Sequence, residues 1–158
     1  MKTLMMIFGA VILINLCSCA TDYYFRPKHS IDRDPRLPDQ TVVDRFKELK
    51  EKNIVPADIR FIDNPYEASF LSTMYDLEVG SFTIRYSSYE EYETIVNDMR
   101  RMAAAAGGNC VVYSYVRAWP YGADAPIYAS KGEIYKVDAK TLKKIHQMIK
   151  SLPLKAAK

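Results

Sequence analysis

The most regular hydrophobic pattern in the chain lies between residues 88 and 106. Apolar residues recur there at steps of three and four, as they do on one face of an α-helix. They are Tyr92, Ile95, Val96, Met99, Met102, Ala103 and Ala106. Ser88 and Glu91 have the spacing of a capping box, which satisfies two backbone N–H groups at a helix start. The pattern therefore predicts a central helix whose first helical residue is Tyr89 and whose left-handed C-terminal cap is Gly107.

After this helix the period falls to about two residues, which is typical of a β-strand over 110–119. One face of this strand carries Cys110, Val112, Ser114, Val116 and Ala118, and the other carries Val111, Tyr113, Tyr115, Arg117 and Trp119. The first face consists of small residues, so we expect the alanine-rich central helix to pack on it. The second face carries large side chains and needs another cover or a partner.

Weaker patterns predict the remaining elements. They are a helix over 41–52, a strand over 57–62, a β run over 69–86, a strand over 127–137 and a final helix over 138–152. Asn64 and Pro65 are expected to close the first of these strands. The apolar phase slips by one residue at Gly80, which indicates a β-bulge. Asp138 is the expected cap of the final helix, and Pro153 is its expected stop.

The order strand, strand, helix, strand, strand, helix predicts an α+β fold. We expect a small mixed β-sheet of four to five strands, with the central helix (about 88–106) packed on it and a C-terminal helix. The chain has 158 residues and is 49% hydrophobic, which suits one domain with a packed core.

The N-terminus has the pattern of an export signal. Lys2 precedes a predominantly apolar run of 13 residues from Leu4 to Leu16, which is shorter than the roughly 20 residues of a membrane span. The next residues complete the sequence Leu16-Cys17-Ser18-Cys19, which resembles the lipobox of bacterial lipoproteins. The resemblance implies that Cys19 is lipidated. An ordinary secretory peptide and an uncleaved anchor are the alternatives.

This signal divides the chain into three segments. Residues 1–18 are the predicted lipoprotein signal peptide, 19–40 a lipidated N-terminus and flexible tether, and 41–158 a single α+β domain in the periplasm. Residues 20–40 hold three prolines and would reach at most about 70 Å if extended. In lipoproteins, Ala20 after the cysteine favours the outer membrane. We therefore expect a lipid-anchored outer-membrane protein with its domain facing the periplasm, and exposure at the cell surface stays open.

A second resemblance rests on the run AAAAGGNCVVYSYV and on the later GEIYK at 132–136. These motifs are similar to a superfamily of small bacterial proteins that includes the outer-membrane stress-sensor lipoprotein of the Rcs phosphorelay. The resemblance covers residues 57–138 and implies the same α+β domain. Cys110 is the only cysteine after Cys19, so the intradomain disulfides of that sensor cannot form here. A redox-coupled signalling role is therefore not expected.

The sequence shows no recognisable catalytic or metal-binding pattern. Net charge is only +3, with acids and bases interspersed, so nucleic-acid binding is not predicted. Cys110 lies on a small-residue β face and is expected to be an inert buried thiol. His29 and His146 share no ligand spacing with Cys, Asp or Glu, so neither a metal nor a cofactor is predicted. The clustered acids Glu90, Glu91 and Glu93 suit the start of a helix better than a hydrolytic acid pair.

Aromatic residues are the candidates for partner binding, because they bury a large area and keep a polar handle. The candidate residues are Tyr113, Tyr115, Trp119, Tyr121, Tyr128 and Tyr135. A cover by the C-terminal helix is the alternative for this face. From residue 139 onward the chain also carries six lysines and no acid. These lysines form either a solvated helix face or a contact for anionic headgroups.

The sequence thus leads to three functional hypotheses. The preferred one is a non-enzymatic, membrane-anchored envelope lipoprotein that binds or senses another envelope component, such as an envelope protein. The second is an envelope enzyme, such as a cell-wall hydrolase, with an unrecognised site. The third is a structural spacer that uses the tether.

Overall fold

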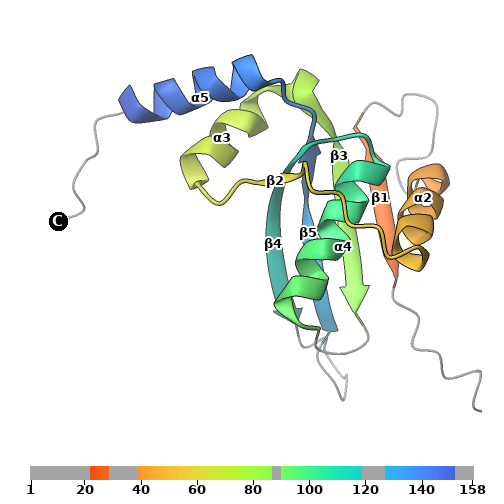
Figure 1. Ribbon diagram of the computed structural model, residues 1–158. Coiled ribbons are helices and arrows are strands. Elements are labelled where there is room, and N and C mark those ends of the chain that lie inside the picture. Colours follow the sequence, from red (N-terminus) through yellow and green to blue (C-terminus); the bar gives the residue numbers. More distant parts are fainter. Residues whose placement is uncertain (1–21, 29–38, 87–89, 119–126, 152–158) are drawn as a thin grey trace, which may run out of the picture.

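The computed structural model describes residues 22–28, 39–86, 90–118 and 127–151 (Figure 1). Within these ranges, five strands form one mixed sheet with four α-helices around it, which confirms the predicted α+β class. The elements are β1 (Tyr23–Pro27), α2 (Gln40–Glu51), β2 (Arg60–Phe61), α3 (Pro65–Thr73), a 3₁₀ turn (Tyr75–Leu77), β3 (Glu78–Tyr86), α4 (Tyr92–Ala105), β4 (Cys110–Ala118), β5 (Ile127–Tyr135) and α5 (Ala139–Ser151).

The sheet has the strand order β1-β3-β5-β4-β2. All its neighbouring strands run antiparallel except β2 and β4, which are parallel. The register of β3 against β5 shifts between Glu78 and Gly80, so the predicted bulge is confirmed. A Cβ atom at Gly80 would lie 2.3 Å from the carbonyl oxygen of Arg26. Only glycine lets β1 pair so closely with β3 at this point.

Helices α4 and α2 cover one face of the sheet and form the main core with it (Figure 1). The core residues include Phe25, Phe46, Phe82, Ile84, Ile95, Met99, Met102, Val111 and Ile134. A buried polar network joins the two helices, because Asp98 accepts hydrogen bonds from Lys50 and from Arg101. Arg101 also donates to the carbonyl oxygen of Ile54 at 3.0 Å, which fixes the chain after α2.

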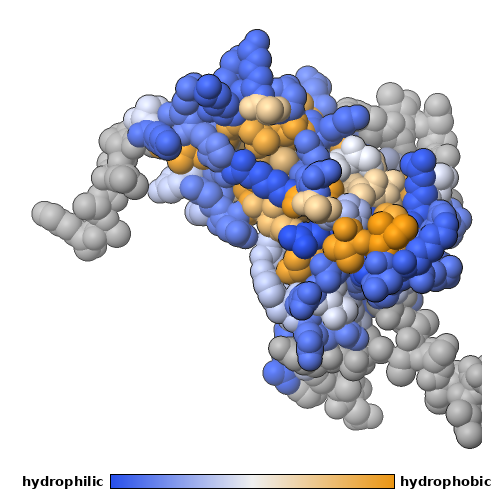
Figure 2. Space-filling model, in the orientation of Figure 1, coloured by the Kyte–Doolittle hydropathy of each residue, from blue (hydrophilic) through white to orange (hydrophobic). Residues whose placement is uncertain are grey.

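Helices α3 and α5 pack on each other at the end of the sheet where β5 finishes (Figure 1). Their apolar residues form a second core with the sheet, consisting of Ile62, Leu71, Cys110, Tyr135, Val137 and Ile145. Thr141 donates its backbone N–H to Asp138, which confirms the predicted cap of the last helix. The outer surfaces of α2 and α5 are mainly hydrophilic (Figure 2), as expected for helices that bury one side only.

The central helix begins later than predicted. Its first residue is Tyr92 rather than Tyr89, and Glu91 at the cap position makes no side-chain hydrogen bond to the helix. Glu91 has an extended backbone, with φ −65° and ψ 146°, so no helical turn includes it. The predicted capping residue, Ser88, lies outside the described residues. At the other end, Gly107 has φ 80° and is the left-handed residue that was predicted.

The predicted β run over 69–86 is wrong in its first part, because residues 65–73 form α3. Asn64 accepts hydrogen bonds from the backbone N–H groups of Tyr66 and Glu67, and Pro65 occupies the first helical position. This pair therefore starts a helix instead of closing a strand, since proline at that position lacks an N–H that would be unpaired in any case.

The predicted tether contains a strand of the sheet. Residues 23–27 form β1, and Phe25 is 1% exposed against the core. The segment reads Tyr-Tyr-Phe-Arg-Pro, so it is short, lacks the apolar–polar alternation of a strand and ends in proline, and it was not recognised. Of the predicted tether, 19–40, residues 19–21 and 29–38 lie outside the described residues, and α2 already begins at Gln40.

Met99 tests the central helix as the main core element. Its side chain is 0% exposed, so Met99→Ala should lower the free energy of unfolding by about 2–5 kcal/mol through lost burial and a residual cavity. Urea denaturation of the domain measures this change. Glu93→Ala, an exposed position on the same helix, is the control and should change stability by less than about 0.5 kcal/mol. Equal effects of the two substitutions would contradict the assignment.

Candidate functional site

The two faces of the sheet differ in chemistry because residues paired directly across strands place their side chains on the same face. The row Phe82, Gly132 and Tyr113 belongs to the face under α4. The neighbouring row, Thr83, Lys131 and Ser114, therefore belongs to the opposite face. We call this side of the sheet, over the strands from β1 through β3 and β5 to β4, the open face. Its row of hydroxyl and ammonium groups is polar where the covered face is apolar.

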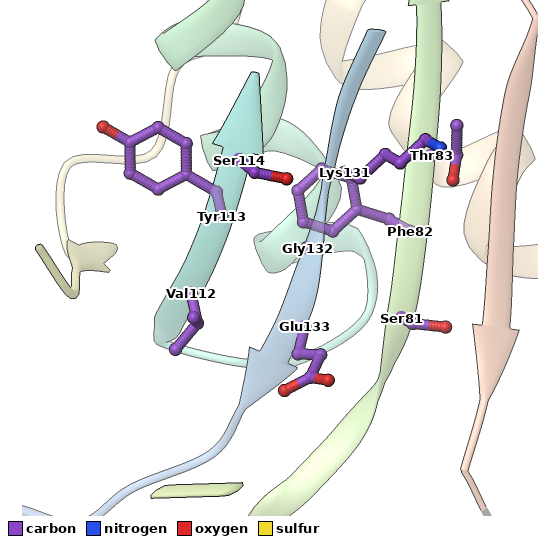
Figure 3. A pocket seen from close by; sticks show the side chains of 9 residues that line it. All are labelled: Ser81, Phe82, Thr83, Val112, Tyr113, Ser114, Lys131, Gly132 and Glu133. Carbon is purple, nitrogen blue, oxygen red and sulfur yellow. The ribbon is translucent and has the colours of Figure 1, made fainter. Parts of the chain in front are cut away.

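A hollow of about 470 Å³ lies on the open face across β3, β5 and β4 (Figure 3). It is lined by Ser81, Phe82, Thr83, Val112, Tyr113, Ser114, Lys131, Gly132 and Glu133. Gly132 belongs to the covered side of the middle strand, where a Cβ atom would lie 2.2 Å from the Val112 carbonyl oxygen and 2.9 Å from the Phe82 ring. A larger residue could not occupy the middle strand at this point without moving its neighbours.

A second hollow, of about 480 Å³, continues the first toward β1. It is lined by Asp22, Tyr23, Tyr24, Arg26, Thr83, Arg85 and Lys131, and it shares Thr83 and Lys131 with the first. Three cationic side chains thus meet on this surface, from β1, β3 and β5. Asp22 and Glu133 are the acids that line the two hollows, so positive charge predominates there.

The cationic side chains of the open face differ in their hydrogen-bond partners. Arg26 donates to the hydroxyl oxygen of Tyr24 at 3.3 Å. Lys131 and Arg85 are exposed and make no side-chain hydrogen bond or ion pair with the described residues. Across the strands, Lys131 faces Thr83 and Ser114, and Arg85 faces Ala129. Asp22 lies across from Arg85 at the start of β1, whereas no acid stands directly opposite Lys131 in these pairings, so Lys131 is the cation most available to an external anion.

Glu133 is the acid nearest to this row, and its carboxylate accepts a hydrogen bond from the hydroxyl group of Tyr135. Burial raises the pKa of that hydroxyl far above its usual value, and the hydrogen bond to Glu133 raises it further. Tyr135 therefore stays a proton donor at any physiological pH. The carboxylate thus has a hydrogen-bond partner within its own strand, and its charge lies on the same face as Lys131.

The six aromatic residues predicted to bind a partner do not share one surface. Tyr113, Tyr115 and Tyr128 lie on the face under α4, where Tyr113 and Tyr128 pack against the main core. Tyr135 lies on the other side of the sheet, in the second core, and is 1% exposed. Trp119 and Tyr121 lie outside the described residues.

The central helix packs on the large face of β4, so the prediction that it packs on the small face is wrong. Val111, which belongs to the large face, is 0% exposed in the main core with Met99 and Met102. Cys110, from the small face, belongs to the second core instead. The two faces of β4 were read correctly, but the large residues are needed to fill the space below α4.

Cys110 has the environment of an inert thiol. It is 0% exposed, and burial raises the pKa of its thiol group, although the nearby Arg60 opposes this shift. The reactive form of a cysteine is the thiolate, which such a site disfavours.

His146 takes part in a polar cluster that the sequence did not reveal. Arg60 donates to both carboxylate oxygens of Glu67, at 2.7 and 3.1 Å, and its guanidinium lies 2.7 Å from Nε2 of His146. The three residues come from β2, α3 and α5, and they are too far apart in the chain for a spacing rule to connect them. The cluster ties the last helix to the sheet.

In the described ranges, no group of three His, Cys, Asp or Glu side chains could hold a metal ion. No helix of those ranges is long and apolar enough to cross a membrane.

Comparison with known proteins does not place the chain in a family. No family model, no curated protein and no solved structure matches it.

Glu67 tests the role of the polar cluster. The carboxylate is 4% exposed, and Glu67→Ala removes both of its hydrogen bonds to Arg60, so stability should fall by about 1–3 kcal/mol. Hydrogen exchange should show the greatest loss of protection in α5 and α3. Glu48→Ala breaks the exposed Glu48–Lys52 pair and should leave the protection of α5 and α3 unchanged. Uniform loss of protection over the whole domain would refute a local role.

Proposed function

We propose that the chain is a non-enzymatic lipoprotein of the bacterial envelope that binds an envelope protein through the open face of its sheet. Two independent features support the two halves of this proposal. The lipobox-like run that ends at Cys19 supports anchoring to the membrane, with the domain on the periplasmic side of the outer membrane. The hollowed polar surface with exposed Lys131 and Arg85 supports binding.

The charge arrangement is the observation that carries the binding proposal. An antiparallel sheet often leaves one face to solvent, and opposite charges then stabilise it as cross-strand pairs. Here, Lys131 stands opposite the neutral residues Thr83 and Ser114, and Arg85 stands opposite Ala129 on β5 and beside Asp22 at the start of β1. Lys131 has no acid directly across the strands from it, so its charge can attract a partner.

The chemistry of the face indicates the kind of partner. The open face carries cations beside the hydroxyl groups of Ser81, Thr83 and Ser114. Both kinds of group donate hydrogen bonds, and a carboxylate accepts several of them, so the face fits a surface that presents carboxylates. The hollow drawn in Figure 3 extends over three strands and is widely open to solvent, which suits a protein surface better than a small molecule. An acidic patch on another envelope protein meets both conditions.

The two other hypotheses have less support. An envelope hydrolase needs a nucleophile or an acid pair, whereas Cys110 is buried and Glu67 is held by Arg60. The spacer hypothesis relied on an extended segment over 20–40, and β1 now occupies 23–27 of it. Turnover of a cell-wall substrate by the purified protein would favour the enzyme.

Photo-crosslinking in cells tests the proposal. A photoreactive residue at Ser81 or Ser114 should give one discrete protein adduct, because both positions line the hollow. The same residue at Lys47, an exposed position on α2, is the control and should give none.

Charge reversal identifies the contact that binds. Lys131→Glu combined with Arg85→Glu should reduce the adduct by about tenfold or more, since like charges would then face an acidic partner. Lys47→Glu with Arg45→Glu makes the same charge change on α2 and should leave the adduct intact. Adducts that survive reversal on the open face would exclude this face as the charged contact.

A further inference from the structure

The sheet begins very close to the proposed lipid anchor. Asp22 is already bound to it, because the backbone N–H of Arg85 donates to the Asp22 carbonyl oxygen at 2.9 Å, and Tyr23 pairs with Ile84. Only three residue steps separate Cys19 from Asp22. At about 3.3–3.6 Å per residue, these steps span at most about 11 Å. If Cys19 is lipidated, the edge of the sheet at Asp22 therefore lies close to the bilayer.

The same short connection determines which end of the domain lies nearest to the bilayer. Asp22 lies beside Arg85, near the end of β3, and Figure 1 shows that β4 ends and α4 starts at this same end. Helices α3 and α5 lie at the opposite end (Figure 1). Strands β3, β4 and β5 each have nine residues, so the two ends are about 30 Å apart at 3.3 Å per residue.

The end near Asp22 carries exposed aromatic and cationic side chains. Tyr92 at the start of α4 is 67% exposed, and Tyr115 toward the end of β4 is 38% exposed. Tyr115 stacks on Tyr128 with ring centroids 6.4 Å apart, and the exposed Arg117 lies 5.7 Å from the centre of the same ring. These contacts hold the rings in place on the rigid sheet.

We propose that this end of the sheet rests on the surface of the membrane, with Tyr92, Tyr115 and Arg117 in the headgroup region of zwitterionic phospholipids. The inference rests on the proposed lipidation of Cys19. Tyrosine favours the membrane–water interface because its ring is apolar and its hydroxyl is polar. Arg85 and Arg117 suit phosphates, and the acids Glu91 and Glu93 beside Tyr92 suit the ammonium groups of such lipids and disfavour a strongly anionic surface.

This orientation also assigns the lysines of the last helix. The exposed residues Lys140, Lys143, Lys144 and Lys150 lie on α5, at the end about 30 Å from the anchored one. They are therefore directed away from the anchoring bilayer. The alternative that these lysines contact its headgroups does not fit the geometry.

Depth-dependent fluorescence quenching tests the orientation. The mature lipoprotein is reconstituted in phosphatidylethanolamine and phosphatidylcholine vesicles, with Trp119→Phe as background and a single tryptophan at Tyr92 or at Tyr115. Brominated lipids should quench both tryptophans at least about twofold more than one at Met148 on α5, which is 37% exposed. Equal quenching at all three positions, whether strong or weak, would overturn the orientation.

A longer linker provides the matched control. Twenty Gly/Ser residues inserted between Ala20 and Thr21 should reduce the quenching at Tyr92 and Tyr115, because the anchor then no longer holds the sheet at the surface. Flotation with the vesicles separates the two proposals. A protein that does not float overturns the anchor and the orientation that rests on it. A protein that floats without selective quenching overturns the orientation alone.

Discussion

The pairing of β1 with β3 is the constraint on which the arrangement of the molecule depends. It requires Gly80, whose missing side chain leaves room for the backbone of β1, and it buries Phe25 against Phe82. Because β1 directly follows the predicted lipidation site, this pairing turns a segment expected to be a long tether into part of the sheet. The distance between lipid and domain then depends on three residue steps before Asp22.

The rest of the sheet gives each of its faces a separate role. Alternation along β3, β4 and β5 sends Ile84, Val111 and Ile134 to the helices, whose positions are fixed by the buried hydrogen bonds of Asp98. The same alternation sends Lys131 to the open face, opposite residues that cannot neutralise it. Packing thus leaves the polar face free, and its charges can be used for binding without a cost in core stability.

The sequence predicted the central helix from its long and unambiguous hydrophobic period. Local signals predicted the bulge at Gly80, the left-handed Gly107 and the cap at Asp138. It failed at α3 because a nine-residue helix with little amphipathic pattern gives no strong period, so Asn64 and Pro65 were taken as a strand end. Which face of β4 the helix covers depends on the volume to be filled in three dimensions, and alternation along one strand does not contain that information. The open face and the Arg60 cluster join distant segments, so no local pattern could indicate them.

The proposed anchor and the proposed binding face together limit where a partner can be. The second hollow includes both Asp22 and Arg85, so the open face begins within about 11 Å of a lipidated Cys19 and extends from there along the strands. A partner on this face must therefore approach along the membrane surface or be embedded in the same membrane. Both the lysines of α5 and the open face carry positive charge, but in the proposed orientation only the face lies beside the bilayer. An acidic protein at the membrane surface can reach that face from the side, while the far end of the domain stays available to other contacts.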